Sequence, residues 1–198
     1  MIRNMTLRDI EPVVETHLLS FPNFFLSILG PRFLSLYYSS LCSDPDGIAL
    51  VGLNQACRIT GFVAGTTNPR GFYTRLLKKQ WLKFAAASFT AVLKKPSIIP
   101  RMLEALSYPK ENPVGLDVAG LYSIGILPSD QQQGMGRHLV AEFLKEARNR
   151  GCRQVFLTTD RDDNQRVNNF YQKTGFIVKR QFITSQGRRM NEYWITLQ

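Results

Sequence analysis

The pattern of hydrophobic and polar positions divides the chain into two regions of different rhythm. In the first region it predicts a short strand at 2–6, helices at 6–19 and 30–41, and a hairpin formed by strands at 47–54 and 57–67. Thr6, followed by Asp9 three residues later, resembles a capping box that begins the first helix. After residue 112, strands at 117–126 and 152–160 alternate with helices at 134–150 and 164–175. Strands at 176–184 and 188–197 then form a final hairpin. Alternating units of this length imply an α/β fold, a mixed sheet with helices on its faces.

Residues 70–112 depart from this rhythm and form one strongly basic segment. Nine basic residues lie between Arg70 and Lys110 against a single acid, Glu104, which gives a balance of +8 out of the chain's net +10. Helical spacing predicts an apolar face and a basic face, made respectively by Tyr73, Leu76, Leu77, Trp81 and Phe84, and by Arg75, Lys78, Lys79 and Lys83. Prolines interrupt the pattern at positions 96 and 100, and a second short helix is expected over 100–108. We therefore expect one domain, residues 1–198, with a basic helical insertion at 70–112 between the third and fourth strands.

Composition excludes several classes of protein. Hydrophobic residues at 44% and charged residues at 20% are ordinary for a folded domain, and no apolar run is long enough to span a membrane. Residues 1–12 lack the apolar region of a secretory signal. The three cysteines, Cys42, Cys57 and Cys152, are far apart and none belongs to a CxxC pair, so neither a disulfide framework nor a metal site is expected. These features favour a cytoplasmic protein.

A glycine-containing turn precedes the helix predicted over 134–150, in the sequence IGILPSDQQQGMGRHLV. Unpaired N–H groups and the helix dipole make such a helix start an anion site, and Gly134 and Gly136 let an anion approach the backbone. Residues 131–137 are therefore a candidate phosphate cradle, to which Arg137 adds a charge. A P-loop is excluded because it needs Lys and Ser or Thr after the glycine, whereas Arg137 and His138 follow Gly136. A dinucleotide fingerprint is excluded because it needs a third glycine at position 139, which is leucine. For this motif alone, an ordinary glycine turn at a helix start is the alternative.

Together with a second motif, this turn resembles the acyl-CoA pyrophosphate loop of the GNAT acyltransferase superfamily. The second motif, DNQRVNNFYQKTGF, is similar to the family's downstream signature at Asn164, Phe170, Tyr171, Gly175 and Phe176. Val167 stands in place of the usual alanine. The resemblance covers residues 117–184 well and the first 66 residues in layout only. It does not extend to the basic segment.

The resemblance implies acetyl-CoA as co-substrate and suggests roles for residues of both motifs. The main chain of Ile124 and Ile126 would bind the pantetheine arm in a gap opened by a bulge, and a nearby N–H would stabilise the developing oxyanion. The diphosphate would lie on Gln131, Gln132, Gln133, Gly134, Met135, Gly136 and Arg137. Tyr171 would protonate the leaving thiolate as general acid, and Asn164 would bind the pantetheine amides. The alternatives are core packing for Ile124, Ile126 and Tyr171, and a helix N-cap for Asn164.

The sequence offers no well-placed general base. Many members of the family keep a glutamate on the fourth strand, whereas residues 120–126 contain no acid here. Asp117 lies upstream and Asp160 ends the next strand, and neither position matches. His17 and His138 are isolated histidines, for which a surface or packing role is expected.

These features predict an N-acetyltransferase that moves an acetyl group from acetyl-CoA to a primary amine of a small molecule, such as an amino sugar. Two alternatives stay open: an acyltransferase that uses longer acyl-CoA or acyl carrier protein at the membrane surface, and a non-catalytic CoA-binding module. The basic segment 70–112 is either a solvated helical hairpin, a contact for an anionic membrane surface, a contact for an acidic carrier protein, or a site for the phosphates of a nucleotide-linked amino sugar. Nucleic acid is not expected, because the charge is confined to one segment. A homodimer and a peripheral location at the inner membrane face are compatible with the sequence.

Overall fold

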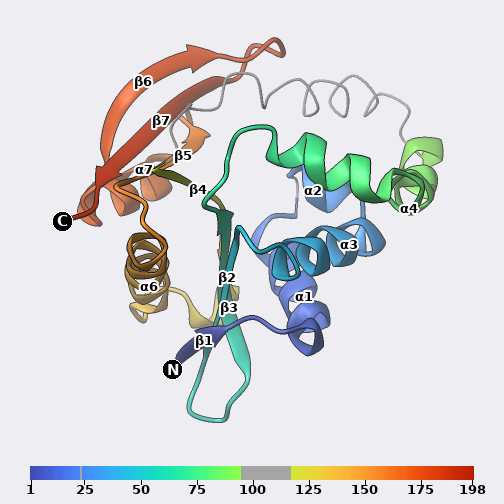
Figure 1. Cartoon of the computed structure of the whole chain (residues 1–198), viewed down its shortest axis with the longest axis horizontal. Helices are drawn as coiled ribbons and strands as arrows, with labels where there is room; N and C mark the ends of the chain where they lie inside the picture. Colours follow the sequence, from blue (N-terminus) through green and yellow to red (C-terminus); the bar gives the residue numbers. More distant parts are fainter. Residues whose placement is uncertain (23, 95–116) are drawn as a thin grey trace.

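The structure, a computed structural model, describes residues 1–22, 24–94 and 117–198. Its strands form one seven-stranded sheet in the order β1-β2-β3-β4-β5-β7-β6 (Figure 1). Their bounds are β1 Ile2–Asn4, β2 Gly47–Leu53, β3 Ile59–Thr66, β4 Val118–Ile126, β5 Gln154–Asp160, β6 Ile177–Ile183 and β7 Arg189–Thr196. Neighbouring strands are antiparallel except β4 and β5, which are parallel. The prediction of a mixed sheet is confirmed.

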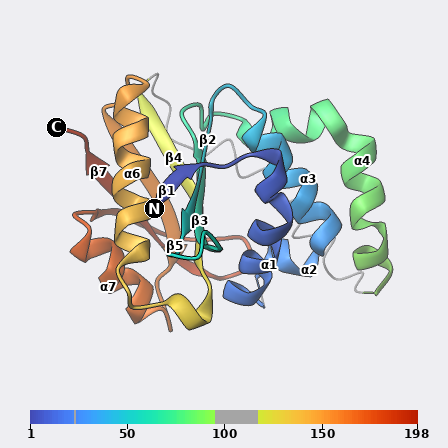
Figure 2. The ribbon, with the colours of Figure 1, turned by 90° about the horizontal axis from the view of Figure 1, so that it is seen from below.

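Helices cover both faces of the sheet (Figures 1 and 2). One face carries α1 Ile10–Ser20, which follows a 3-10 turn at Leu7–Asp9, together with α2 Phe25–Ile28 and α3 Pro31–Cys42. The other face carries α6 Met135–Asn149 and α7 Gln165–Lys173. Between β3 and β4 in the chain, α4 Phe72–Lys94 packs on α3 and forms the outermost layer of the molecule (Figure 2).

Local interactions explain where the first elements begin and end. The backbone N–H of Thr6 donates to the Asp9 carboxylate at 2.8 Å, as the predicted capping box requires, and the Thr6 hydroxyl donates to the same carboxylate at 2.8 Å. Arg3 on β1 donates to both Asp9 oxygens, at 2.6 and 2.8 Å, and so joins the first strand to the first helix. At the β2–β3 hairpin, the side-chain oxygen of Asn54 accepts hydrogen bonds from the N–H groups of Ala56 and Arg58, which closes the predicted turn.

The core has two main layers, one on each side of the sheet. On the α1/α3 side, helix and strand residues pack together without solvent exposure, among them Val13, Leu34, Tyr38, Leu41, Val51 and Phe62. On the α6/α7 side the apolar stripe predicted for the helix at 134–150 is buried, through Leu139, Val140, Phe143 and Ala147. Helix α6 therefore covers the sheet with the face that its sequence period predicts.

One prediction about the basic segment was wrong. Trp81 was expected on the packed face of the helix beside Phe84, but Trp81 is 62% exposed and Phe84 is 3% exposed. The cause is a break at Gln80, whose φ of −142° and ψ of 32° are not helical and change the phase of the following turns. The Gln80 side chain donates to the Ser40 hydroxyl at 3.1 Å, which ties the break to α3. The short helix predicted over 100–108, like the rest of 95–112, lies outside the described residues.

Candidate active site

Strands β4 and β5 diverge in the middle of the sheet. They pair only at three positions, where Val118, Ala119 and Gly120 face Gln154, Val155 and Phe156. Beyond this point β4 continues to Ile126 and β5 to Asp160 with no pairing between them. On its other edge β4 carries a bulge, because Ala64 pairs with Ser123 and Gly65 with Leu121, which leaves Tyr122 as the extra residue. The bulge and the divergence together open a gap between the two strands.

The backbone of β4 offers unpaired polar groups to this gap. Leu127 N–H donates to the Thr60 carbonyl of β3 at 2.8 Å, and successive amides of a strand point to opposite sides. The N–H groups of Ile124 and Ile126 therefore point away from β3 and toward the gap. The Ile126 carbonyl already accepts from the Ser20 hydroxyl at 3.0 Å and from the Gln131 side-chain amide at 3.3 Å. A main chain without a strand partner inside a sheet is suited to bind the amides of an extended ligand.

The loop after β4 leads into a helix start with unused amides. A 3-10 turn at Pro128–Asp130 follows the strand, and Gln132 (φ 67°) and Gly134 (φ 84°) then adopt left-handed conformations. The first hydrogen bond of α6 runs from His138 N–H to the Gly134 carbonyl at 3.2 Å. The N–H groups of Met135, Gly136 and Arg137 precede it and have no intrahelical partner, so they lie at the positive end of the helix dipole.

The side chains of this loop leave the amides accessible. Gln131 turns back to the end of β4, and Met135 turns inward, where its sulfur fills the space beside Gly52 on β2. Gln132, Gln133 and Arg137 are exposed. A Cβ at Gly136 would stand 3.4 Å from the ring of Phe170, an ordinary contact, so the missing side chain leaves an open approach to the backbone and does not relieve strain. The loop and the gap are the places where the resemblance in sequence predicts the diphosphate and the pantetheine arm of coenzyme A.

Tyr171 lies on α7 in the same core cluster as Ile124 and Ile126. It is 6% exposed, and its ring contacts those of Phe170, Phe176 and Tyr193 at centroid distances of 5.2 to 5.8 Å. Burial raises the pKa of Tyr171 well above the usual value of a phenol. No group of the described residues forms a hydrogen bond with its hydroxyl, so the hydroxyl remains available to a bound molecule.

Asn164 and Asn168 anchor α7 to the end of β5. Asn164 occupies the N-cap position, but its side chain does not cap the helix and donates instead to the Thr159 hydroxyl at 2.9 Å and the Asp160 carbonyl at 3.0 Å. Asn168, which the sequence did not single out, is buried and accepts from Tyr193 Oη and from the Asn191 side-chain amide, each at 2.9 Å. Asn168 is four residues after Asn164 and three before Tyr171, so the three residues lie on one side of the helix. This spacing could have identified Asn168 from the sequence.

The opposite face of the bulge is lined by aromatic residues from the first half of the chain. The Tyr122 ring packs against those of Phe72 and Tyr73, at centroid distances of 5.1 and 5.4 Å. Nearby, the buried His17 shares a hydrogen bond of 2.6 Å between Nδ1 and Tyr38 Oη. Burial lowers the pKa of His17 to about 4, so the imidazole is neutral at pH 7. The packing role expected for His17 agrees with this position.

Carboxylates at the start of β4, at the end of β5 and on β7 lie beside arginines. Asp160 accepts from Arg188 at 2.7 to 3.0 Å through both its oxygens, and Asp117 lies 3.9 Å from Arg153. Glu192 on β7, which the sequence did not single out, is buried and bonded by Trp194 Nε1 at 2.8 Å and by Arg180 at 3.0 Å. Asp160 and Glu192 are therefore held in ion pairs, whereas Asp117 is half-exposed.

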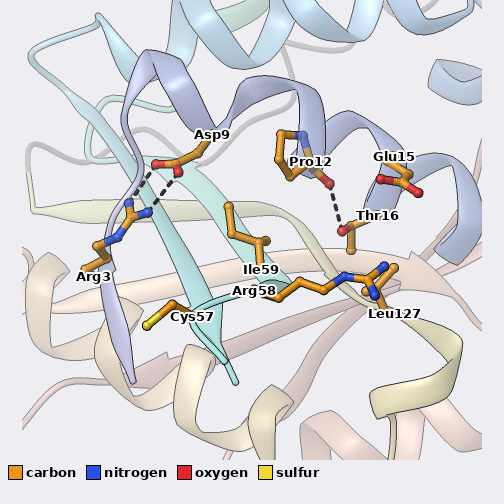
Figure 3. Close-up of a pocket in the computed structure, with 9 residues that line it drawn as sticks. All are labelled: Arg3, Asp9, Pro12, Glu15, Thr16, Cys57, Arg58, Ile59 and Leu127. Carbon is orange, nitrogen blue, oxygen red and sulfur yellow. Dashed lines mark hydrogen bonds and ion pairs between the residues drawn. The ribbon is translucent and has the colours of Figure 1, made fainter. Parts of the chain in front are cut away.

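A separate open pocket of about 340 Å³ lies between α1 and the β2–β3 turn (Figure 3). The Arg3–Asp9 ion pair and the hydrogen bond from the Thr16 hydroxyl to the Pro12 carbonyl occupy most of its polar groups. It touches the site only through Leu127, at the end of β4. The described residues contain no cluster of three or more histidine, cysteine or acidic side chains that could bind a metal ion.

Comparison with known proteins agrees with this site. The sequence profile described as the Acetyltransferase (GNAT) family matches residues 14–176. No curated protein matches the sequence. Three solved structures share the fold over the whole of this chain: aminoglycoside 6'-acetyltransferase type Ii (14% identity, 97% of that chain, TM-score 0.66), aminoglycoside 6'-N-acetyltransferase complexed with coenzyme A (12%, 97%, 0.65) and the ribosomal-protein-S18-alanine N-acetyltransferase from Escherichia coli (14%, 93%, 0.60).

A mixed sheet that opens between two parallel strands, beside a helix start with unused amides, defines an acyl-CoA-binding fold. The chain belongs to the acetyltransferase (GNAT) family, since the match at residues 14–176 covers most of its length. It is an acyl-CoA-dependent N-acetyltransferase, with acetyl-CoA as co-substrate. The fold is common to enzymes with unlike acceptors, an aminoglycoside and an alanine of ribosomal protein S18 among them, so it does not determine the acceptor.

Proposed function

We propose that this enzyme acetylates a primary amine of a small molecule, an amino sugar, and that Tyr171 acts as the general acid. The observation that carries the proposal is the gap beside β4. There, the backbone groups of Ile124 and Ile126 belong to the part of β4 that does not pair with β5, and α6 begins just after this strand with the free amides of Met135, Gly136 and Arg137. Ile124 and Ile126 pack on the core cluster that contains Tyr171. The amide groups bind and orient the co-substrate, and an N–H of the Ile124–Ile126 stretch stabilises negative charge on the acyl oxygen.

The protons that the reaction moves suggest a role for the Tyr171 hydroxyl. Acetyl transfer breaks a thioester C–S bond and forms an amide C–N bond, so the thiolate gains a proton and the amine loses one. A thiol has a pKa near ~8.5 and a phenol near ~10, which makes the proton transfer uphill by about 2 kcal/mol before any shift. Burial raises the pKa of Tyr171 and so keeps its hydroxyl protonated at neutral pH. The residue therefore carries a proton that it can donate and is unsuited to accept one, while the raised pKa makes the donation more uphill than the value for an ordinary phenol.

The acceptor is proposed to approach from the aromatic side of the bulge, where Tyr122 and Tyr73 lie. Amino sugars carry a primary amine on a ring with one apolar face, and aromatic side chains stack on such faces. The solved aminoglycoside acetyltransferases of the same fold support this class of acceptor.

The test measures thiol release from acetyl-CoA with a panel of four amines: glucosamine, kanamycin, spermidine and an alanyl peptide. We expect turnover with the amino sugars and little with the polyamine or the peptide. Turnover confined to the alanyl peptide would contradict the acceptor class, and no thiol release with any amine would contradict the activity.

Tyr171→Phe tests the acid, and Tyr193→Phe is its matched control in the same aromatic cluster. Since the Tyr171 hydroxyl has no hydrogen bond among the described residues, its removal should lower kcat by about 10²- to 10⁴-fold and leave stability and CoA affinity nearly unchanged. Tyr193→Phe removes a buried hydrogen bond to Asn168 and should cost about 1–3 kcal/mol of stability with a much smaller effect on kcat. Equal kcat for Tyr171→Phe and the parent would exclude Tyr171 from the proton transfer.

A further inference from the structure

An apolar face runs along the outer side of α4, and no other described element packs on it. Leu82, Phe89 and Leu93 are 64%, 59% and 65% exposed, and Trp81 beside them is 62% exposed. Leu82 and Phe89 are seven residues apart and Phe89 and Leu93 four, so the three side chains lie in line along one side of the helix. We call these four residues the α4 outer face.

The inner side of the same helix is already packed. Phe84 is 3% exposed and meets Phe33 of α3 ring to ring, with centroids 5.0 Å apart. Leu76 and Ala87 are buried with it. The α4 outer face therefore points away from the domain, on the outermost layer of the molecule (Figure 2). An exposed row of large apolar side chains marks an interaction surface, since folded domains seldom leave such a row in water.

The charge of α4 indicates what this surface contacts. The sequence of Phe72–Lys94 contains five basic residues and no acid. Lys78 and Lys83 are exposed on α4, and neither forms an ion pair with a described residue. A second copy of the chain docked by a two-fold axis would bring these lysines against each other, whereas an anionic surface would neutralise them.

We infer that the α4 outer face docks on an anionic lipid surface. A basic helix with Trp, Phe and Leu on one side lies in the interface plane, with its apolar side chains among the acyl chains and its lysines at the headgroups. Among the described residues no helix is both long and apolar enough to cross a membrane, so α4 would lie on the surface. This inference does not depend on the acceptor, and it places the acetyl transfer next to a membrane.

Flotation of the full chain with lipid vesicles tests the inference without an activity assay. Wild type should bind vesicles of phosphatidylcholine with 30% phosphatidylglycerol, bind pure phosphatidylcholine at least about tenfold more weakly, and lose affinity as salt rises. Leu82→Ser with Phe89→Ser should weaken binding to the anionic vesicles by about 10- to 100-fold. Lys78→Glu with Lys83→Glu should do the same, through charge alone.

Ile183→Ser is the matched control, because Ile183 is an equally exposed apolar residue, at 69%, on β6. It should bind vesicles as wild type does. Tryptophan emission gives an independent readout, since the exposed Trp81 should shift to the blue on binding while the buried Trp194 should not change. Trp81→Phe should remove the shift.

Three outcomes would overturn the inference: no binding of wild type to anionic vesicles, binding that both double variants retain, or equal binding to neutral vesicles. A concentration-dependent dimer in ultracentrifugation that Leu82→Ser with Phe89→Ser abolishes, without vesicle binding, would instead assign the surface to a second copy. Thermal unfolding of each variant separates loss of binding from loss of fold. Loss of vesicle binding with full turnover in solution leaves the proposed function intact.

Discussion

His17 makes the stability of this protein sensitive to mild acid. It is one of only two histidines in the chain and is buried against Phe21, Tyr38 and Phe62. Burial lowers its pKa to about 4, below the value near 6.5 that the unfolded chain would have. Because the folded pKa is the lower one, stability is full well above pH 6.5 and falls as the pH drops from 6.5 toward 4.

The two pKa values set the size of this effect. Linkage between them gives a loss of about 2 kcal/mol of unfolding free energy between pH 7 and pH 5, where the unfolded chain binds a proton that the folded protein excludes. Asp9 contributes nothing in this range, because its ion pair with Arg3 holds its pKa well below the usual value. His17 should therefore dominate the difference.

Urea unfolding at pH 7 and pH 5 measures the loss. His17→Gln keeps a group that can bond the Tyr38 hydroxyl but does not titrate, so its stability should change by about 2 kcal/mol less than that of wild type between the two pH values. His138→Gln, at the exposed second histidine, is the control and should follow wild type closely. Parallel pH dependences for wild type and His17→Gln, or an imidazole pKa above 6 by NMR, would refute the reasoning.

Two further predictions follow from packing and ion pairing. Gly65→Ala would drive a methyl group into the Gly120 carbonyl at the bulge and to 2.7 Å from the Phe143 ring, so the free energy of unfolding should fall by more than about 3 kcal/mol. Gly136→Ala should keep the fold and weaken CoA binding. Thermal melts and CoA titration separate the two. Asp9→Asn removes the Arg3 ion pair that holds the pKa of this carboxyl far below its usual range, which should cost about 1–3 kcal/mol at pH 7. The cost should shrink as the pH falls below about 3.9, where the unfolded chain binds a proton that the folded protein excludes. Identical urea midpoints at pH 7 would contradict the assigned role of Asp9.

Short-range patterns were enough to predict most elements of this fold. The capping pair Thr6–Asp9, the apolar stripe of the helix at 134–150 and the alternation of the later strands each depend on residues that are neighbours in the sequence. The glycine turn also predicted a helix start with free amides, because Gly134 requires a left-handed conformation and the first turn of any helix leaves its N–H groups unpaired. The brief helix at 25–28 carried no comparable signal.

The site itself depends on contacts between distant parts of the chain. The gap beside Ile124 exists because β4 and β5 pair only up to Gly120, and the bulge at Tyr122 is a matter of register with β3, which no local pattern encodes. The neutral state of His17 arises from α3 and β3 packing around it. The side of α4 that faces out was set by the break at Gln80, which shifts the phase of a helix whose sequence alone put Trp81 inside. Periodicity determines which elements form, while pairing register, burial and helix phase are decided only when the elements meet.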